Sequence, residues 1–208
     1  MPREIVFGGN QSLLVCLDKN YYIRDIYYPH VGMENHVSGH KCRIGIYDSL
    51  NSDFSWLEND NWKKKIKYKK NTLVGNSLIV NEKMGIKLRF NDCVHHKKNI
   101  FLRRLKIYNL KNEKREFRVY FSQDLQIKGL DIGNTAYYDS ETKSLVHYHT
   151  NRWFMFKGRT ESKDSIDSFA TGKAHFQSSD GTFRDAEDWK LSENPIEQGT
   201  VDSTIQIN

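Results

Sequence analysis

Apolar and polar residues alternate with a period of two along most of the chain. The alternation is clearest at residues 99–110 and 115–127, where aromatic and β-branched side chains recur. A short polar turn at residues 111–114 joins these two segments, so the pattern predicts that they pair as a hairpin. Turn residues between alternating segments predict three further hairpins, over residues 12–28, 72–94 and 144–158.

The remaining segments add strands and very little helix. Residues 41–48, 54–57 and 62–68 each alternate, and the last segment carries a run of lysines, WKKKIKYKK, typical of an edge strand with one solvated face. Residues 159–199 are polar, with a short helix expected at 185–192 and Asp185 as its cap. The sequence therefore predicts an all-β fold, a large antiparallel β-sandwich with at most one or two short helices.

The final residues, TVDSTIQIN, begin a strand and stop within it. A core strand is an unusual place for a chain to end. We therefore expect residues 1–208 to form one β-sandwich domain that is cut near its C-terminal end.

The composition supports a folded domain and limits the kinds of partner that it is expected to bind. Only 38% of the 208 residues are hydrophobic, but 11 Tyr, 11 Phe and 4 Trp supply large buried areas. The net charge of +6 would suit a nucleic-acid partner. However, the lysines alternate with apolar residues and no recognition motif accompanies them, so we expect no nucleic acid.

The cysteines and the hydropathy pattern bear on location. Cys16, Cys42 and Cys93 are odd in number and widely spaced, as expected of free thiols in a reducing compartment. No segment is apolar for long enough to serve as a signal peptide or a membrane span. These features predict a cytoplasmic protein with no membrane partner.

The run YYPHVGMENHVSGHKC, residues 27–42, is the most unusual stretch of the sequence. Its histidines, its acid and its two glycines form a loop, which is a common place for function. His36 and His40 have the spacing of ligands on one helix face, but Pro29 and Gly39 argue against a helix there. We therefore predict no metal site in this loop.

Other candidate chemistry is weaker still. His147 and His149 would point to one face of a strand, but the residues after them do not complete a metal-binding motif, so a polar hairpin face is the preferred interpretation. Acids at Asp185, Glu187 and Asp188 share one short helix, which is the wrong geometry for flanking a glycosidic bond. No nucleotide, phosphate or nucleophile motif is present, so we expect no catalytic residue and no cofactor.

Several stretches together resemble one known family. They are GGNQSLLVCLDKNYYIRDIYYPHVGMENH, FSWL, NIFLRRLKIYN, FSQDLQIKGLDIGNTAYYD, LVHY and NPIEQGTVDST. This succession is similar to the N-terminal domain of bacterial and archaeal glucoamylase-like proteins of glycoside hydrolase family 15, and the most specific parts are YYPHVGMENH and GNTAYYD. The resemblance covers nearly the whole chain.

The resemblance implies a large sandwich, often called a supersandwich, that precedes a catalytic (α/α)6 barrel. Because the barrel carries the catalytic glutamates and is absent here, the chain alone is expected to have no activity. The parent would be an inverting glycoside hydrolase: a glucoamylase, a glucodextranase or a trehalase. The barrel is the implied partner, together with an α-glucan or another glucoside.

The resemblance also points to one surface. The loop of residues 28–36 would lie against the barrel near the sugar cleft, and its polar groups would be left unpaired by the domain's own packing. The candidate residues for interdomain or substrate-side contacts are Tyr28, Pro29, His30, Glu34, Asn35 and His36.

Two other functions remain open at this point. The chain could be an autonomous carbohydrate-binding domain that stacks sugars on Trp56, Trp62 or Trp153, although burial in the core is the more common place for a tryptophan. A basic nucleic-acid-binding domain is the weaker alternative.

Overall fold

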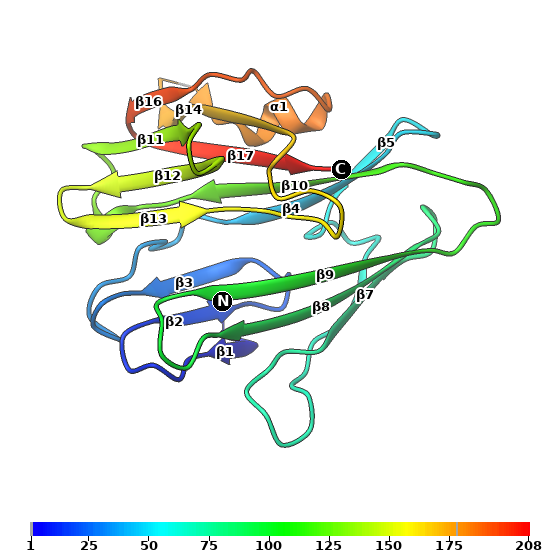
Figure 1. Ribbon diagram of the computed structural model, residues 1–208, viewed down its shortest axis with the longest axis horizontal. Coiled ribbons are helices and arrows are strands. Elements are labelled where there is room, and N and C mark those ends of the chain that lie inside the picture. Colours follow the sequence, from blue (N-terminus) through cyan, green and yellow to red (C-terminus); the bar gives the residue numbers. More distant parts are fainter. Residues whose placement is uncertain (1, 178) are drawn as a thin grey trace.

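The computed structural model describes residues 2–177 and 179–208, and its strands form two stacked layers (Figure 1). The lower layer combines a three-stranded sheet of order β1-β2-β3 with a four-stranded sheet of order β6-β7-β8-β9. The upper layer combines a six-stranded sheet, β15-β14-β17-β10-β4-β5, with a four-stranded sheet, β13-β12-β11-β16. Every pairing is antiparallel, so the predicted antiparallel β-sandwich is confirmed.

The lower layer contains most of the first half of the chain. Its strands are β1 (Ile5–Phe7), β2 (Leu14–Leu17), β3 (Ile23–Tyr27), β6 (Lys63–Lys65), β7 (Ser77–Asn81), β8 (Ile86–Val94) and β9 (Phe101–Asn109). The predicted hairpins β2–β3 and β7–β8 are present, and lysine-rich β6 is an edge strand as expected.

The upper layer joins β4 and β5 to the second half of the chain. Its strands are β4 (Arg43–Asp48), β5 (Asp53–Trp56), β10 (Phe117–Asp124), β11 (Asn134–Asp139), β12 (Ser144–His149), β13 (Arg152–Phe156), β14 (Ser168–Phe176), β15 (Ser179–Asp180), β16 (Ile196–Gly199) and β17 (Val201–Ile207). The hairpin β12–β13 was predicted, and β17 lies in the middle of the six-stranded sheet, between β10 and β14.

The predicted pairing of residues 99–110 with residues 115–127 is wrong. β9 pairs with β8 in the lower layer, whereas β10 pairs with β4 and β17 in the upper layer. Arg115 explains the separation, because its buried guanidinium bonds Asp48 Oδ2 (2.7 Å) and the carbonyl oxygens of Met84 and Gly85 (2.8 and 2.9 Å). These bonds hold the connection between β9 and β10 as a crossing from one layer to the other.

The described chain contains one α-helix, α1 (Phe183–Glu187), and one 3₁₀ turn, η1 (Ile127–Gly129). The helix begins earlier and is shorter than predicted. Asp185 lies in its first turn and Thr182 occupies the capping position, so the expected capping role of Asp185 is wrong.

The main core fills the space between the layers. Inward residues of β8, Ile86, Leu88 and Phe90, are fully buried and belong to one cluster with Ile46 and Val119 of the upper layer. A second, smaller cluster lies under α1, where Tyr120 packs with Trp56 and Ala186. Period-two alternation thus places one face of each layer in the shared core.

Candidate functional site

The connection between β3 and β4 holds the predicted site residues and is a closed, ordered loop. Tyr28 N–H donates to the Glu34 carbonyl (3.3 Å), and Met33 N–H donates to the His30 carbonyl (3.1 Å). The Tyr28–Pro29 peptide bond is cis. Tyr28 itself packs edge-on against Phe154 of β13, which fixes the base of the loop on the upper layer.

His36 anchors this loop in the core. Its side chain is fully buried, with Nε2 2.6 Å from the Tyr28 carbonyl oxygen, and Lys128 N–H donates to Nδ1 (3.0 Å). Because Nδ1 accepts, the ring proton lies on Nε2 and is donated to Tyr28. Burial lowers the pKa of His36, which keeps the ring neutral.

Asn35 and Glu34 are also paired within the domain. Asn35 Nδ2 donates to Asp25 Oδ1 (2.7 Å), and its Oδ1 accepts from the N–H of Ile26 and of Val37. Glu34 receives two bonds of 2.8 Å from Arg152 at the start of β13. The Arg152 guanidinium lowers the pKa of the Glu34 carboxyl.

The expectation that the loop's polar groups lack partners within the domain is therefore wrong for Glu34, Asn35 and His36. What the loop does present outward is its tip. His30 is exposed, and two apolar neighbours project beside it, Val31 at 46% and Met33 at 80% exposure. No sequence signal identified Arg152 as the partner of Glu34, because 118 positions separate the two residues.

An exposed apolar surface lies next to the loop on the outer face of β13, β12, β11 and β16. Trp153 stacks on Tyr148 (4.3 Å between ring centroids, 12° between planes), and Tyr137 meets Tyr148 edge-on. The strand register puts Met155 and Ile196 on the same face, which we call the aromatic sheet face. Trp153 and Met155 remain more than half exposed, at 55% and 59%.

The three tryptophans considered for sugar stacking differ in their exposure to solvent. Trp56 and Trp62 are buried, and their indole N–H groups donate to Glu187 and Ser55. Trp153 alone among the three offers a face to solvent. Burial in the core, the more common place for a tryptophan, is thus confirmed for two of them.

A pocket of about 370 Å³ lies beside β3 and is lined by two carboxylates, those of Asp18 and Asp25. Asp25 bonds Arg3 and Asn35, whereas Asp18 accepts from the N–H groups of Asn20 and Tyr22. Both carboxylates are thus engaged in structural bonds.

Histidines 147 and 149 do not form the polar hairpin face that the sequence suggested. His147 is fully buried, and its Nε2 lies 2.6 Å from Ser203 Oγ of β17. It packs edge-on against Phe156 inside the sandwich.

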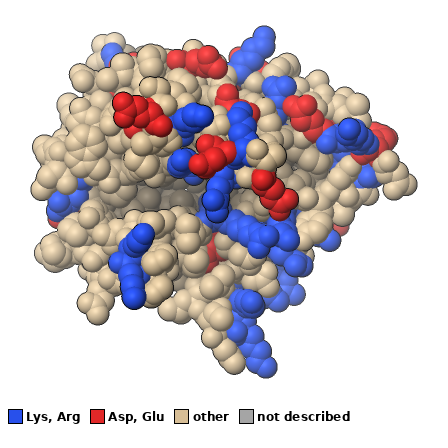
Figure 2. Space-filling model, in the orientation of Figure 1, with Lys and Arg blue, Asp and Glu red and all other residues tan. Residues whose placement is uncertain are grey.

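Charge is unevenly distributed between the layers. Figure 2 shows Asp and Glu mainly over the upper layer of this face, intermingled with Lys and Arg, whereas the charged residues over the lower layer are mainly Lys and Arg. The register of β6 to β9 gathers basic residues on the outer face of that sheet: Lys63, Lys65, Lys87, Arg89, Arg104 and Lys106. Within the residues described, no helix has the length and apolar character needed to cross a bilayer.

Comparison with known proteins finds similar chains, and two of them are informative. An uncharacterized glycosyl hydrolase of Methanocaldococcus jannaschii is 29% identical over 201 residues, which covers 96% of this chain and 30% of that protein. A bacterial glucoamylase, solved in complex with acarbose, superposes with a TM-score of 0.81 and 13% identity over 100% of this chain and 30% of its own. No protein-family model matches the chain.

These similarities confirm the resemblance drawn from the sequence. The fold is that of part of a bacterial glucoamylase, and the sequence is similar to that of a glycosyl hydrolase. The chain spans about three tenths of the length of each of these relatives.

Proposed function

We propose that this chain is the non-catalytic β-sandwich domain of a glucoamylase-type α-glucosidase, and that it packs on and stabilises the catalytic barrel of that enzyme. The observation that carries the proposal is the extent of similarity. A glycosyl hydrolase and a glucoamylase each match nearly the whole of this chain with less than a third of their own length.

The chemistry of the described residues supports a non-catalytic role. Asp18 and Asp25, in the pocket beside β3, are held by hydrogen bonds and an ion pair. The acids of α1, Asp185 and Glu187, lie two positions apart on one short helix. An inverting mechanism needs an acid and a base on opposite sides of the sugar, and neither group of acids provides that arrangement.

The surface that packs on the barrel is, in this proposal, the loop tip together with the aromatic sheet face. Val31 and Met33 project from the loop, and Trp153 and Met155 project from β13, all with large exposed areas. The paired Glu34 and Arg152 join the two regions. Exposed apolar side chains that lie together are typical of an interaction surface.

A glucosidase assay tests the non-catalytic role. The 208-residue chain, purified from a host without glucosidases, should release no glucose from maltose, starch, dextran or trehalose. Glucose release that follows the chain through purification would overturn the proposal.

Packing on a barrel is tested by reading the gene past Asn208 and producing the continuous polypeptide. The double substitution M33S/W153S should lower the unfolding temperature of that longer protein while leaving the 208-residue chain nearly unchanged, because both side chains are solvated in the latter. A stop codon directly after Asn208, or equal effects on the two proteins, would contradict the proposal.

A second candidate, an autonomous carbohydrate-binding domain, is favoured by one observation. The stacked Trp153 and Tyr148 rings offer a flat, solvated platform of the kind on which sugar rings stack. Titration with maltooligosaccharides separates the candidates, since only this one requires binding that W153A abolishes in the 208-residue chain.

A further inference from the structure

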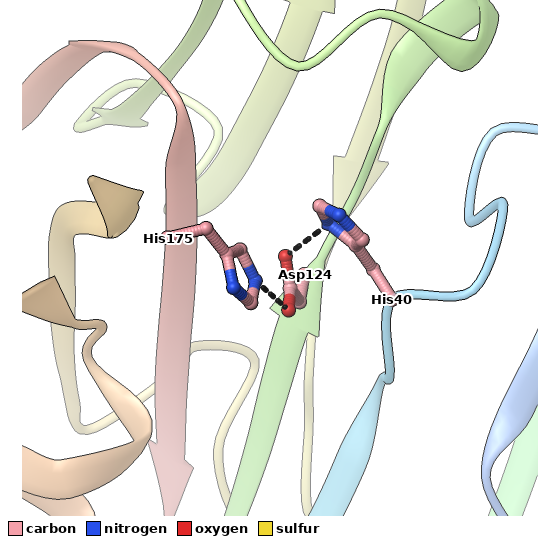
Figure 3. A group of neighbouring side chains, drawn as sticks. All are labelled: His40, Asp124 and His175. Atoms are coloured by element: carbon pink, nitrogen blue, oxygen red, sulfur yellow. Dashed lines mark hydrogen bonds and ion pairs between the residues drawn. The ribbon is translucent and has the colours of Figure 1, made fainter. Parts of the chain in front are cut away.

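His40, Asp124 and His175 converge at one point of the upper layer, although they are far apart in the sequence (Figure 3). His40 Nδ1 lies 2.8 Å from Asp124 Oδ1, and His175 Nε2 lies 2.8 Å from Asp124 Oδ2. The two rings are 4.5 Å apart between centroids. One candidate ligand atom from each residue lies within 4.8 Å of the other two.

Each of these side chains is directed toward the cluster by an irregularity of the backbone or by the end of a strand. Asp124 is the last residue of β10, and His40 follows Gly39, which has a positive φ of 99°, just before β4. His175 lies where the β14–β15 register shifts, and its own φ is +59°. Bulges of this kind turn a side chain away from the regular alternation, and left-handed residues other than glycine are uncommon.

We infer that His40, Asp124 and His175 form a binding site for a divalent first-row transition metal such as Zn²⁺. Two imidazoles and one carboxylate are a donor set that such ions accept, whereas Ca²⁺ and Mg²⁺ select oxygen ligands. Ligands about 2.0–2.2 Å from a tetrahedral ion lie about 3.4 Å from one another. The two histidine–carboxylate separations of 2.8 Å are shorter than that spacing and the three ligand atoms lie within 4.8 Å of one another, so side-chain rotations would bring them around one ion.

The surroundings of the three residues fit a cation. His40 presents Nδ1 to Asp124, and its Nε2 lies 3.5 Å from a carboxylate oxygen of Asp131, which accepts a hydrogen bond from Gln126. A carboxylate behind a histidine fixes the ring and strengthens its other nitrogen as a ligand.

Exposure decides how an ion would enter. The Asp124 side chain is only 7% exposed and that of His40 20%, but the His175 side chain is 52% exposed. The site therefore opens to solvent on the His175 side, and three protein ligands leave a coordination position for water. An ion there would link the segment before β4 to the end of β10 and to β14. This inference is independent of the proposed association with a barrel.

Calorimetric titration with Zn²⁺ after chelation tests the site, and the absorption spectrum of bound Co²⁺ reports its ligands. We expect one ion per chain and, at about a hundredfold excess over Kd, a rise in unfolding temperature of about 5 °C or more. H175A should weaken binding by about 100-fold or more, and D131N by about tenfold, because losing a ligand costs more than losing its supporting carboxylate.

His96→Ala is the matched control, since His96 is an exposed histidine that stacks on His95 far from this cluster in the sequence. It should leave affinity, stoichiometry and the Co²⁺ spectrum unchanged. H175A removes a half-exposed side chain and is expected to fold, so its far-ultraviolet circular dichroism serves as the folding check. Absence of binding by the unaltered chain, or equal binding by H175A, would overturn the inference.

Discussion

His147 illustrates how a buried histidine can couple this fold to pH. Ser203 Oγ–H donates to Gln123, so the serine oxygen accepts the proton of His147 Nε2. His147 Nδ1 is then a bare acceptor, and within the described part of the chain it has no hydrogen-bond partner. Protonating this nitrogen would place an unpaired charge in the core, and burial accordingly lowers the pKa of His147 to about 4.

We therefore expect the contribution of His147 to the free energy of unfolding to fall between pH 6.5 and pH 4, whereas Asp202, whose pKa burial raises to about 7, contributes in the opposite direction. The unfolded chain binds a proton at His147 with a pKa of about 6.5, so its contribution is complete above that pH and is lost as pH falls toward 4. The full difference is on the order of 3 kcal/mol. Denaturant unfolding over this range should show that the free energy of unfolding of the unaltered chain, relative to that of H147Q, declines as the pH falls. Equal slopes would contradict this role.

The loop histidines give a second prediction at this scale. H36A should destabilise the chain by about 2–4 kcal/mol, because it opens a cavity beside Phe154 and leaves the Tyr28 carbonyl and the Lys128 N–H unpaired. H30A, at the exposed tip of the same loop, should change stability by less than about 0.5 kcal/mol. Thermal or urea unfolding measures both variants, and similar losses would show that His36 is not the anchor.

At the scale of elements, the chain crosses from the lower layer to the upper layer between β9 and β10, and this crossing divides the fold into two layers. Both segments alternate well, and the turn between them suits a hairpin, so local sequence signals favour the wrong pairing. Arg115 instead bonds the β7–β8 turn and Asp48 of β4. These partners lie 30, 31 and 67 positions away, and no local pattern reports them.

R115A should cost about 3–5 kcal/mol of unfolding free energy, since it leaves the Asp48 carboxylate buried and uncompensated. The matched control is R118A, whose guanidinium is partly exposed and meets Glu116 at 3.4 Å. That pair should contribute less than about 1 kcal/mol. Urea unfolding compares the two variants, and a small effect of R115A would remove Arg115 as the explanation for the crossing.

The hairpins β2–β3, β7–β8 and β12–β13 were predictable because both strands and the turn are contiguous, so period and turn chemistry suffice. The candidate sites were harder to predict from the sequence than the hairpins. The sequence indicated the loop of residues 27–42 as unusual, but His40 was considered only together with His36, and that spacing was rejected as a metal site. The fold instead brings His40 to Asp124 and His175 through pairings between distant strands.

At the scale of the whole molecule, the separation of charge gives the nucleic-acid alternative a definite test. The outer face of the β6 to β9 sheet is basic, whereas acids are mostly on the upper layer (Figure 2). Such a face attracts phosphates without reading bases. Tyr108 is the aromatic residue on this face among β6 to β9, and Lys87 already covers its ring.

We therefore expect duplex DNA to be retained weakly, without sequence preference, and to be released by about 200 mM salt. Filter binding or fluorescence anisotropy over a salt series measures this. Retention that persists at that salt concentration, or that depends on sequence, would revive a nucleic-acid function.

The position of β17 has a consequence for how the protein is made. The strands β4, β5 and β10 leave the ribosome well before β17. The edge of β10 that pairs with β17 therefore stays unpaired until β17 has also been synthesised. At usual rates of synthesis, the residues between β10 and β17 take on the order of several seconds to emerge. During that time an unpaired strand edge is available to other nascent chains. Chaperone occupancy during translation should therefore be greatest on the segment that begins at β10.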